Sequence, residues 1–237
     1  MLGKQISDHY IFHYHTNSQA ETDISRIIDV QETCFNYISK VLGIKFEHKI
    51  EYYLCQSKEE VGEFYGDYEP CSAFARRPNK VYAVYNEDFR CIGFHEDAHL
   101  ISYQINTPKS VAVREGLAMF FDKNWWGISN VEWVKYYLKT NQYESIKELM
   151  EDHYFYNVDC TISYPIMGCF TEYLIMTYGM SQYLKFYRCE EEDLITHFEH
   201  CYKKTFQQLE REFITYLNLF KSDEVVEQRI QNLLKND

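Results

Sequence analysis

The feature that most constrains this chain is the segment 94–100, FHEDAHL, which contains the pattern His-Glu-x-x-His. Residues four apart lie on one face of an α-helix, about one turn from each other. In a helix, His95 and His99 therefore direct two imidazoles at one metal ion. A catalytic zinc site has three protein ligands and an open position for water. Glu96 lies beside the same face, where it reaches that water as a general base for metal-assisted hydrolysis.

The third ligand has to come from another segment, and the best candidate is Glu115 in the segment 113–118, VREGLA. Two histidines and one glutamate form a recognised shell of catalytic zinc. The residues around Glu115 predict a second helix. Gly116 and Ala118 are small, so we expect this helix to approach the first one closely.

The pattern His95-Glu96-x-x-His99, followed by Glu115 in a Glu-Gly-x-Ala segment, resembles the gluzincin metallopeptidases. It is most similar to their peptidase MA-like branch, in which the third ligand lies in such a helix. Downstream, the segment 164–170 and the pairs Tyr-Leu at 173–174 and Tyr-Gly at 178–179 are similar to that branch's next helix. The resemblance covers roughly residues 10 to 217. It implies an α+β fold of thermolysin-like type and zinc-dependent hydrolysis of peptide bonds.

The resemblance also implies roles for residues outside the metal shell. Gluzincins stabilise the oxyanion with a tyrosine or histidine of the helical lobe, and the matching position here is Tyr164. His153, Tyr154 and Tyr156 are alternatives. In gluzincins, extended substrate adds to the edge strand before the active-site helix. That implies substrate binding by a short strand segment, Tyr82, Ala83, Val84 and Tyr85.

The chain departs from the family's pattern at two places. Met119 stands four residues after Glu115, where thermolysin-like enzymes carry the aspartate that supports a ligand histidine. The motif Gly-x-Met-Glu-Asn, which holds the free amine in many gluzincin aminopeptidases, is absent. Endopeptidase activity is therefore favoured over aminopeptidase activity. The alternatives are a catalytically inactive or regulatory metal-binding module that binds a protein partner, and hydrolysis of a non-peptide amide. The presence of Glu96 argues against the module, because a structural metal site does not require it.

Composition excludes several other functions. The net charge of −12 argues against a general nucleic-acid role and against binding to anionic membranes. The N-terminus has no apolar core of signal-peptide length, and no apolar run approaches the ~18 residues of a membrane span. We therefore expect a cytoplasmic protein that acts on a peptide or protein substrate. The eight cysteines are then reduced thiols, and none has C-x-x-C spacing: Cys34, Cys55, Cys71, Cys91, Cys160, Cys169, Cys189 and Cys201.

Hydrophobic periodicity predicts a mixed lobe followed by a helical lobe. The expectation is a single domain, 1–237, with an α+β lobe at 1–106, a helical lobe at 107–237 and the metal between them. The segment 67–79 is predicted as a loop. The predicted strands are 10–15, 49–55 and 80–85, and the predicted helices are 21–42, 58–65, 88–105, 110–122, 130–139, 145–152, 163–178, 190–201, 205–220 and 225–234.

Other conspicuous residues have a simpler interpretation. The pairs His13 with His15 and His197 with His200 each share one face of an element, but neither has a third ligand nearby in the sequence. We interpret them as ordinary surface or half-buried histidines. The segment 125–127, WWG, is interpreted as packing between subdomains, since aromatic side chains most often serve packing.

Overall fold

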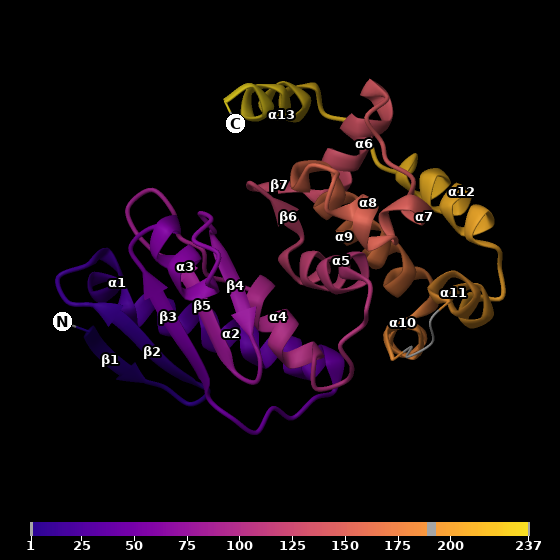
Figure 1. Cartoon of the computed structure of the whole chain (residues 1–237). Helices are drawn as coiled ribbons and strands as arrows, with labels where there is room; N and C mark the ends of the chain where they lie inside the picture. The colour runs from indigo at the N-terminus through magenta and orange to yellow at the C-terminus, as the bar shows by residue number, and fades with distance from the viewer. Residues whose placement is uncertain (1, 189–192, 237) are drawn as a thin grey trace. The chain divides into compact units, whose positions relative to one another are not determined.

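The N-terminal part of the chain forms one five-stranded sheet in the computed structural model, which describes residues 2–188 and 193–236 (Figure 1). The sheet order is β1-β2-β3-β5-β4, with β2, β3 and β5 parallel and the edge strands β1 and β4 antiparallel to their neighbours. The predicted strands at 10–15, 49–55 and 80–85 are confirmed, whereas β1 and β4 were not predicted. The bounds are β1 Leu2–Ile6, β2 Tyr10–His15, β3 Ile50–Cys55, β4 Ala73–Arg76 and β5 Lys80–Val84.

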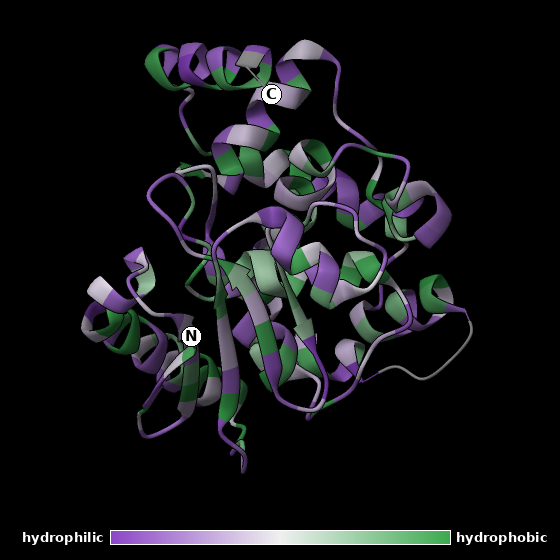
Figure 2. Cartoon of the chain, turned by 60° about the vertical axis from the view of Figure 1, so that its left-hand side comes forward, coloured by the Kyte–Doolittle hydropathy of each residue, from purple (hydrophilic) through white to green (hydrophobic). Residues whose placement is uncertain are grey.

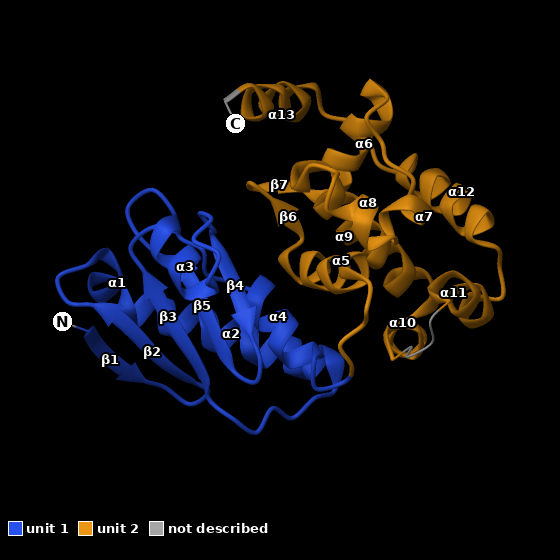
Figure 3. Cartoon of the chain, in the orientation of Figure 1, with its two compact units in different colours: residues 1–105 blue, residues 106–237 orange. Residues whose placement is uncertain are grey.

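The chain divides into two compact units, residues 1–105 and 106–237 (Figure 3). Unit 1 holds the sheet and the helices α1 to α4, while unit 2 is mainly helical. This composition confirms the mixed α+β class that the sequence predicts. The helices of unit 1 are α1 Gln19–Thr22, α2 Ile24–Leu42, α3 Lys58–Tyr65 and α4 His95–Ser102.

Helix ends in unit 1 follow their capping residues. The Ser57 side chain accepts a hydrogen bond from the backbone N–H of Glu60 and starts α3, which ends at Gly66 with φ of 106°. Gly43 ends α2 with φ of 66°. Glycine is favoured at both C-termini because it adopts the left-handed conformation without strain.

The two faces of the sheet are covered by different helices. The Tyr10 hydroxyl of β2 donates to Asp97 of α4 and lies 3.0 Å from the Gln31 carbonyl of α2, so these helices lie on its face of the sheet. On the other face, Val61 of α3 packs into a buried cluster with Tyr82 and Val84 of β5. The inner strands β2, β3 and β5 therefore bury both sets of their alternating side chains at least partly, and they form the core of unit 1.

The predicted helix 88–105 is shorter than expected, because α4 begins only at His95. The residues before it form a turn, in which the Asn86 side chain accepts hydrogen bonds from the backbone N–H groups of Asp88 and Phe89. Arg90 then pairs with Tyr85 as an isolated β-bridge. Gly93 has φ of 134°, which no helical residue adopts. The helix therefore starts at the first residue of the His-Glu-x-x-His pattern.

Unit 2 is built around the long buried helix α9. Its helices confirm most of the C-terminal predictions, and the predicted helix 190–201 begins outside the described residues. Cys189 also lies outside them. The elements are α5 Val111–Asp122, β6 Asn124–Trp125, β7 Ile128–Ser129, α6 Asn130–Thr140, α7 Ile146–Leu149, α8 Asp152–Phe155, α9 Cys160–Tyr178, α10 Met180–Tyr187, α11 Leu194–Tyr202, α12 Phe206–Leu217 and α13 Glu224–Asn236.

Helices α5 and α9 approach each other closely through glycines. A Cβ at Gly116 would lie 2.6 Å from the Thr171 hydroxyl, and one at Gly168 would lie 2.5 Å from the Cβ of Met119. Both distances are shorter than a side chain tolerates, so only glycine fits. Gly116 therefore makes room for α9. The expected close approach to the helix with the histidines stays a prediction.

Pro165 lies farther inside α9 than expected. The predicted helix 163–178 would put it in the first turn, but the helix begins at Cys160, where Asp159 accepts a hydrogen bond from the Thr161 backbone. Because proline has no N–H, the carbonyl of Thr161, four residues earlier, loses its helical partner. The Tyr137 hydroxyl donates a 2.7 Å hydrogen bond to that carbonyl and replaces the missing interaction.

The last helix, α13, is amphipathic. Hydrophilic and hydrophobic residues alternate along it in Figure 2, close to the C-terminal label. Ile230 is fully buried, whereas Val225 is 78% exposed. The helix packs on α6 through its apolar side and ends unit 2.

Candidate metal site

Helix α4 is held at its start by Gln31 of α2. The Gln31 amide accepts a 2.7 Å hydrogen bond from the Gly93 N–H and donates one of 3.2 Å to the Gly93 carbonyl. Both contacts fix the backbone just before His95. Gln31 is itself fully buried, so this attachment is part of the core of unit 1.

His95 and His99 occupy successive turns of α4, as the spacing predicts. Their ring centroids lie 5.0 Å apart with planes at 81°. The Tyr103 hydroxyl lies 3.4 Å from Nδ1 of His99, and the two rings stack. This contact places a hydroxyl group beside Nδ1 of His99. Ligating histidines commonly have such a partner on the other ring nitrogen.

Asp97, between the two histidines, is completely buried. It accepts hydrogen bonds from the Tyr10 hydroxyl of β2 and, at 2.9 Å, from the Gln31 amide of α2. Burial raises the pKa of Asp97 well above its usual range, although these two hydrogen bonds oppose the shift. The carboxyl group therefore anchors α4 to the sheet and to α2. Sequence reasoning missed this role because Tyr10 and Gln31 lie 87 and 66 residues away.

Glu96 is half-buried, and the helix that carries it, α4, packs against β4 and β5. Burial raises the pKa of the thiols of Cys71 and Cys91, and the negative charge of Glu96 adds to the shift in both cases. Both thiols pack against the cluster of Tyr82 and Val84. Glu96 lies next to His95 on the helix that carries the two histidines.

Glu115 lies in the second turn of α5 and is half-buried. The start of this helix is held by the Asp152 carboxylate, which accepts a 2.8 Å hydrogen bond from the Val111 N–H. The Arg114 guanidinium donates to the carbonyls of Pro108 and Lys109, at 2.7 and 2.9 Å. The cation beside Glu115 is therefore used to hold the segment that leads into α5.

The three sequence-predicted ligands form one group that could hold a metal ion. One ligand atom from each of His95, His99 and Glu115 lies within 4.8 Å of the other two. Among the described residues, no other group of histidines, cysteines and carboxylates meets this condition. His13 and His15 instead pair with Glu51 and Glu60, at 3.9 and 2.7 Å, as the interpretation of ordinary histidines expects.

Tyr164 lies on α9 among aromatic side chains. Its ring contacts Trp125 edge-to-face at 5.3 Å and stacks on Phe155 at 5.8 Å. Trp125 therefore packs within unit 2, against the helix that carries Tyr164. The role of the Tyr164 hydroxyl as an oxyanion donor stays a prediction.

The prediction that residues 82–85 form an edge strand is wrong, because β5 lies inside the sheet. Tyr82, Ala83 and Val84 belong to β5, which pairs with β3 on one side and β4 on the other, and the Tyr85 N–H binds the Cys55 carbonyl. Their backbone groups are thus engaged within the sheet. The edge beyond β5 is β4, because residues 73–76 form a strand where the sequence predicts a loop. Helix α4 packs against β4, so the edge next to the histidine helix is β4.

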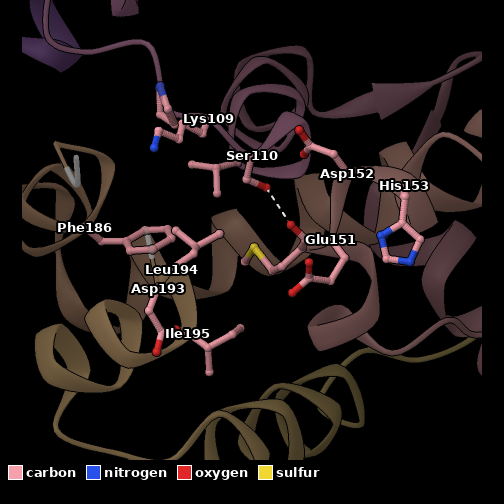
Figure 4. Close-up of a pocket in the computed structure, with 12 residues that line it drawn as sticks. Lys109, Ser110, Glu151, Asp152, His153, Phe186, Asp193, Leu194 and Ile195 are labelled. Carbon is pink, nitrogen blue, oxygen red and sulfur yellow. Dashed lines mark hydrogen bonds between the residues drawn. The ribbon is translucent and has the colours of Figure 1, made fainter. Parts of the chain in front are cut away.

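Unit 2 contains a hollow of about 350 Å³ between the start of α5 and the segments before α8 and α11 (Figure 4). The Ser110 hydroxyl donates a 3.0 Å hydrogen bond to the Met150 carbonyl at its wall. His153, one of the alternatives for the oxyanion donor, is among the lining residues. Tyr164 is not among the lining residues, so the hollow does not bring His153 and Tyr164, the two candidate oxyanion donors, together.

Comparison with known proteins gives no further assignment. No family model matches the chain, and no curated protein matches it either. Within residues 2–188 and 193–236, no helix combines the length and the apolar character that a membrane span requires. The chemistry of the site therefore has to be judged from its own residues.

Proposed function

We propose that this chain is a zinc-dependent hydrolase of gluzincin type that cleaves peptide bonds, with endopeptidase favoured over aminopeptidase activity. The observation that carries the proposal is the group of His95, His99 and Glu115, whose ligand atoms lie within 4.8 Å of one another. Glu96 directly follows the first ligand on the same helix. The arrangement of a small sheet, a histidine helix and a following glutamate helix supports the thermolysin-like fold within the α+β class.

The donor set fits zinc. Two imidazole nitrogens and one carboxylate oxygen are a known catalytic zinc shell, and ligands about 2.1 Å from the ion lie roughly 3.4 Å from each other. Ligand atoms that already lie within 4.8 Å reach this spacing by small side-chain rotations. Three protein ligands leave a coordination position for water, which a closed structural site would not offer.

A zinc ion held by these residues would supply Lewis-acid chemistry, lowering the pKa of a water molecule toward neutrality and polarising the scissile carbonyl. Glu96 takes the proton from that water and delivers it to the leaving amine. Tyr164 donates a hydrogen bond to the oxygen on which negative charge develops. Asp97, through Tyr10 and Gln31, holds the helix that positions His95 and Glu96.

Extended substrate binds along β4 in this proposal, in place of the segment 82–85. β4 is one of the two edge strands of the sheet, and α4 packs against it. A peptide that adds to such an edge gains backbone hydrogen bonds and presents its side chains alternately to the two faces. The scissile bond is thereby brought past the helix that carries Glu96.

Metal content and cleavage test the proposal together. We expect about one zinc per wild-type chain by mass spectrometry, and loss of most of it in Glu115→Ala. Glu63→Ala, which removes an exposed carboxylate of α3, should keep the zinc. Zinc retained in Glu115→Ala would show that Glu115 is not the third ligand.

The second part compares the wild type with Glu96→Gln in a peptide-library assay. Both proteins should bind zinc, because Glu96 is not a ligand, but only the wild type should cleave. We expect a loss of at least about a hundredfold in kcat when a general base is removed. If neither protein cleaves any peptide while both bind zinc and the same protein partner, the chain is a metal-binding module and the enzyme proposal is wrong.

A further inference from the structure

A row of aromatic rings crosses the sheet on the face that α3 covers. Tyr53 of β3, Tyr82 of β5 and Phe74 of β4 are register partners on neighbouring strands. Tyr53 stacks on Tyr82 with ring centroids 4.7 Å apart, and Tyr82 stacks on Phe74 at 4.9 Å. The row therefore runs from the interior of the sheet to its open edge, where Phe74 is its last ring.

Two side chains flank Phe74 at that edge. The ring of Tyr65, at the end of α3, meets it edge-to-face at 5.0 Å, and the Arg76 guanidinium lies 5.2 Å from its centroid. Tyr65 is 54% exposed and Arg76 is also exposed. We call Tyr65, Phe74 and Arg76 the aromatic shelf. It offers ring surface and a positive charge to any chain that lies beside β4.

One nitrogen of the Arg76 guanidinium donates to two backbone carbonyls of α3. Its Nη2 donates to the carbonyls of Phe64 and Tyr65, at 2.8 and 3.1 Å, which fixes the guanidinium over the rings. Within the described part of the chain it has no carboxylate partner, although the protein carries a net charge of −12. A guanidinium has five N–H donors in a planar fork, so those not engaged by the carbonyls can bind a carboxylate.

The backbone of β4 is also available for pairing. The Ser72 carbonyl accepts a 2.9 Å hydrogen bond from Val84 of the neighbouring segment. Because pairs alternate along antiparallel strands, the backbone groups of Ala73 and Ala75 point to the open edge. The Cys71 thiol donates to the Ala73 carbonyl at 3.2 Å, and the groups of Ala75 remain for a bound strand.

We propose that the aromatic shelf selects extended peptides that carry an aromatic and an acidic residue two positions apart. This inference rests on the proposed function and names its substrate class. Phe74 and Arg76 are two residues apart and so share a face of the sheet, as do residues two apart in a paired strand. The aromatic side chain packs on Phe74 and Tyr65 while the carboxylate binds Arg76. The spacing of two is the same for either direction of the bound peptide.

Binding tests the inference independently of cleavage. The protein is the full chain carrying Glu96→Gln, with and without added zinc, and the probes are fluorescein-labelled decapeptides measured by anisotropy. The peptides are serine-rich and contain Phe-Ser-Glu, Phe-Ser-Lys or Ala-Ser-Glu. We expect Phe-Ser-Glu to bind roughly fivefold tighter than Phe-Ser-Lys, and roughly two- to fivefold tighter than Ala-Ser-Glu.

Substitutions in the shelf should change these ratios separately. Arg76→Glu should reverse the preference between Glu and Lys, and Phe74→Ala should abolish that between Phe and Ala. Arg26→Glu, which changes an exposed arginine of α2, should leave both ratios unchanged. If a substitution impairs folding, the relative affinities of the Glu96→Gln protein for the three peptides still test the inference.

Three results would overturn the inference: equal binding of all three peptides by the parent protein, no binding of any peptide, or a dimer in solution that Arg76→Glu dissociates. The last result would make a second copy of this chain the occupant of the β4 edge. Failure of the proposed function is a different outcome, namely selective binding by the parent protein while the wild type cleaves nothing.

Discussion

At the scale of single residues, Glu32 shows how one carboxylate ties two elements together. It accepts hydrogen bonds from the Ser7 hydroxyl at 2.6 Å and from the His9 N–H at 2.8 Å, and its second oxygen lies 2.6 Å from the His9 ring. These contacts join the turn between β1 and β2 to α2. Burial raises the pKa of Glu32, but the hydrogen bonds from Ser7 and His9 outweigh it, so the net shift is downward.

A lowered pKa in the folded state makes the contribution of Glu32 to stability depend on pH. The folded protein releases this proton at lower pH than the unfolded chain, whose glutamates titrate near ~4.3. The stabilisation is therefore fully present above that pH and is lost as the pH falls through the folded-state pKa. We expect Glu32→Gln to lose about 1–2 kcal/mol of unfolding free energy at pH 7. Urea unfolding of both proteins from pH 7 to pH 3 should show the difference shrinking below about pH 4. A difference that stays constant over this range would contradict the assignment.

Single residues also show which features of the site the sequence could predict and which it could not. The spacing of His95, Glu96 and His99 places all three on one helix face, because helical periodicity is local. Asp97 lies inside the same pattern, yet nothing near it in the sequence indicates its partners. Its role depends on Tyr10 and Gln31, which only the fold brings to it.

At the scale of elements, local signals predicted the helices well and the edge of the sheet poorly. Ser57 and Gly66 mark the ends of α3 in the sequence, and both have these roles in the structure. β4 has only the residues 73–76, between two prolines and polar neighbours, so it has no periodicity of its own. It is a strand because β5 offers it a partner. A short edge strand cannot be separated from a loop without its neighbour.

The alternation of hydrogen bonds along β4 leads to a prediction for two proline substitutions. In Ala75→Pro the lost N–H faces the open edge, so we expect a loss of stability below about 1 kcal/mol. In Phe74→Pro the lost N–H bonds to β5, and the loss should be about 3 kcal/mol or more. Thermal unfolding measures both.

The same pair of variants tests the function of the edge. Ala75→Pro removes the donor that a bound strand needs, so it should weaken peptide binding although the fold is kept. Similar losses of stability in the two variants would show that the assigned alternation is wrong. Unchanged peptide binding by Ala75→Pro would show that substrate does not pair with β4.

At the scale of the whole molecule, the proposed zinc site would link local chemistry to global stability. The proposed ligands lie on α4 and α5. The change near residue 106 from mixed structure to helices follows from hydrophobic periodicity, which the sequence displays. The ligand geometry does not follow from periodicity, because it depends on how separate helices pack.

Removal of zinc should therefore destabilise the folded chain. A ligand that binds only the folded state stabilises it by about 2.7 kcal/mol at a concentration one hundred times its Kd. For a chain of 237 residues, this corresponds to a decrease in Tm of roughly 5–10 °C when a chelator removes the metal. Zinc binding by any of the eight cysteines in the unfolded chain would reduce this shift. Glu115→Ala carries the same cysteines, so it is the matched control. We expect calorimetry to show a chelator effect in the wild type and little or none in Glu115→Ala. Equal shifts in the two proteins would mean that zinc acts through the thiols, and that His95, His99 and Glu115 do not form its site.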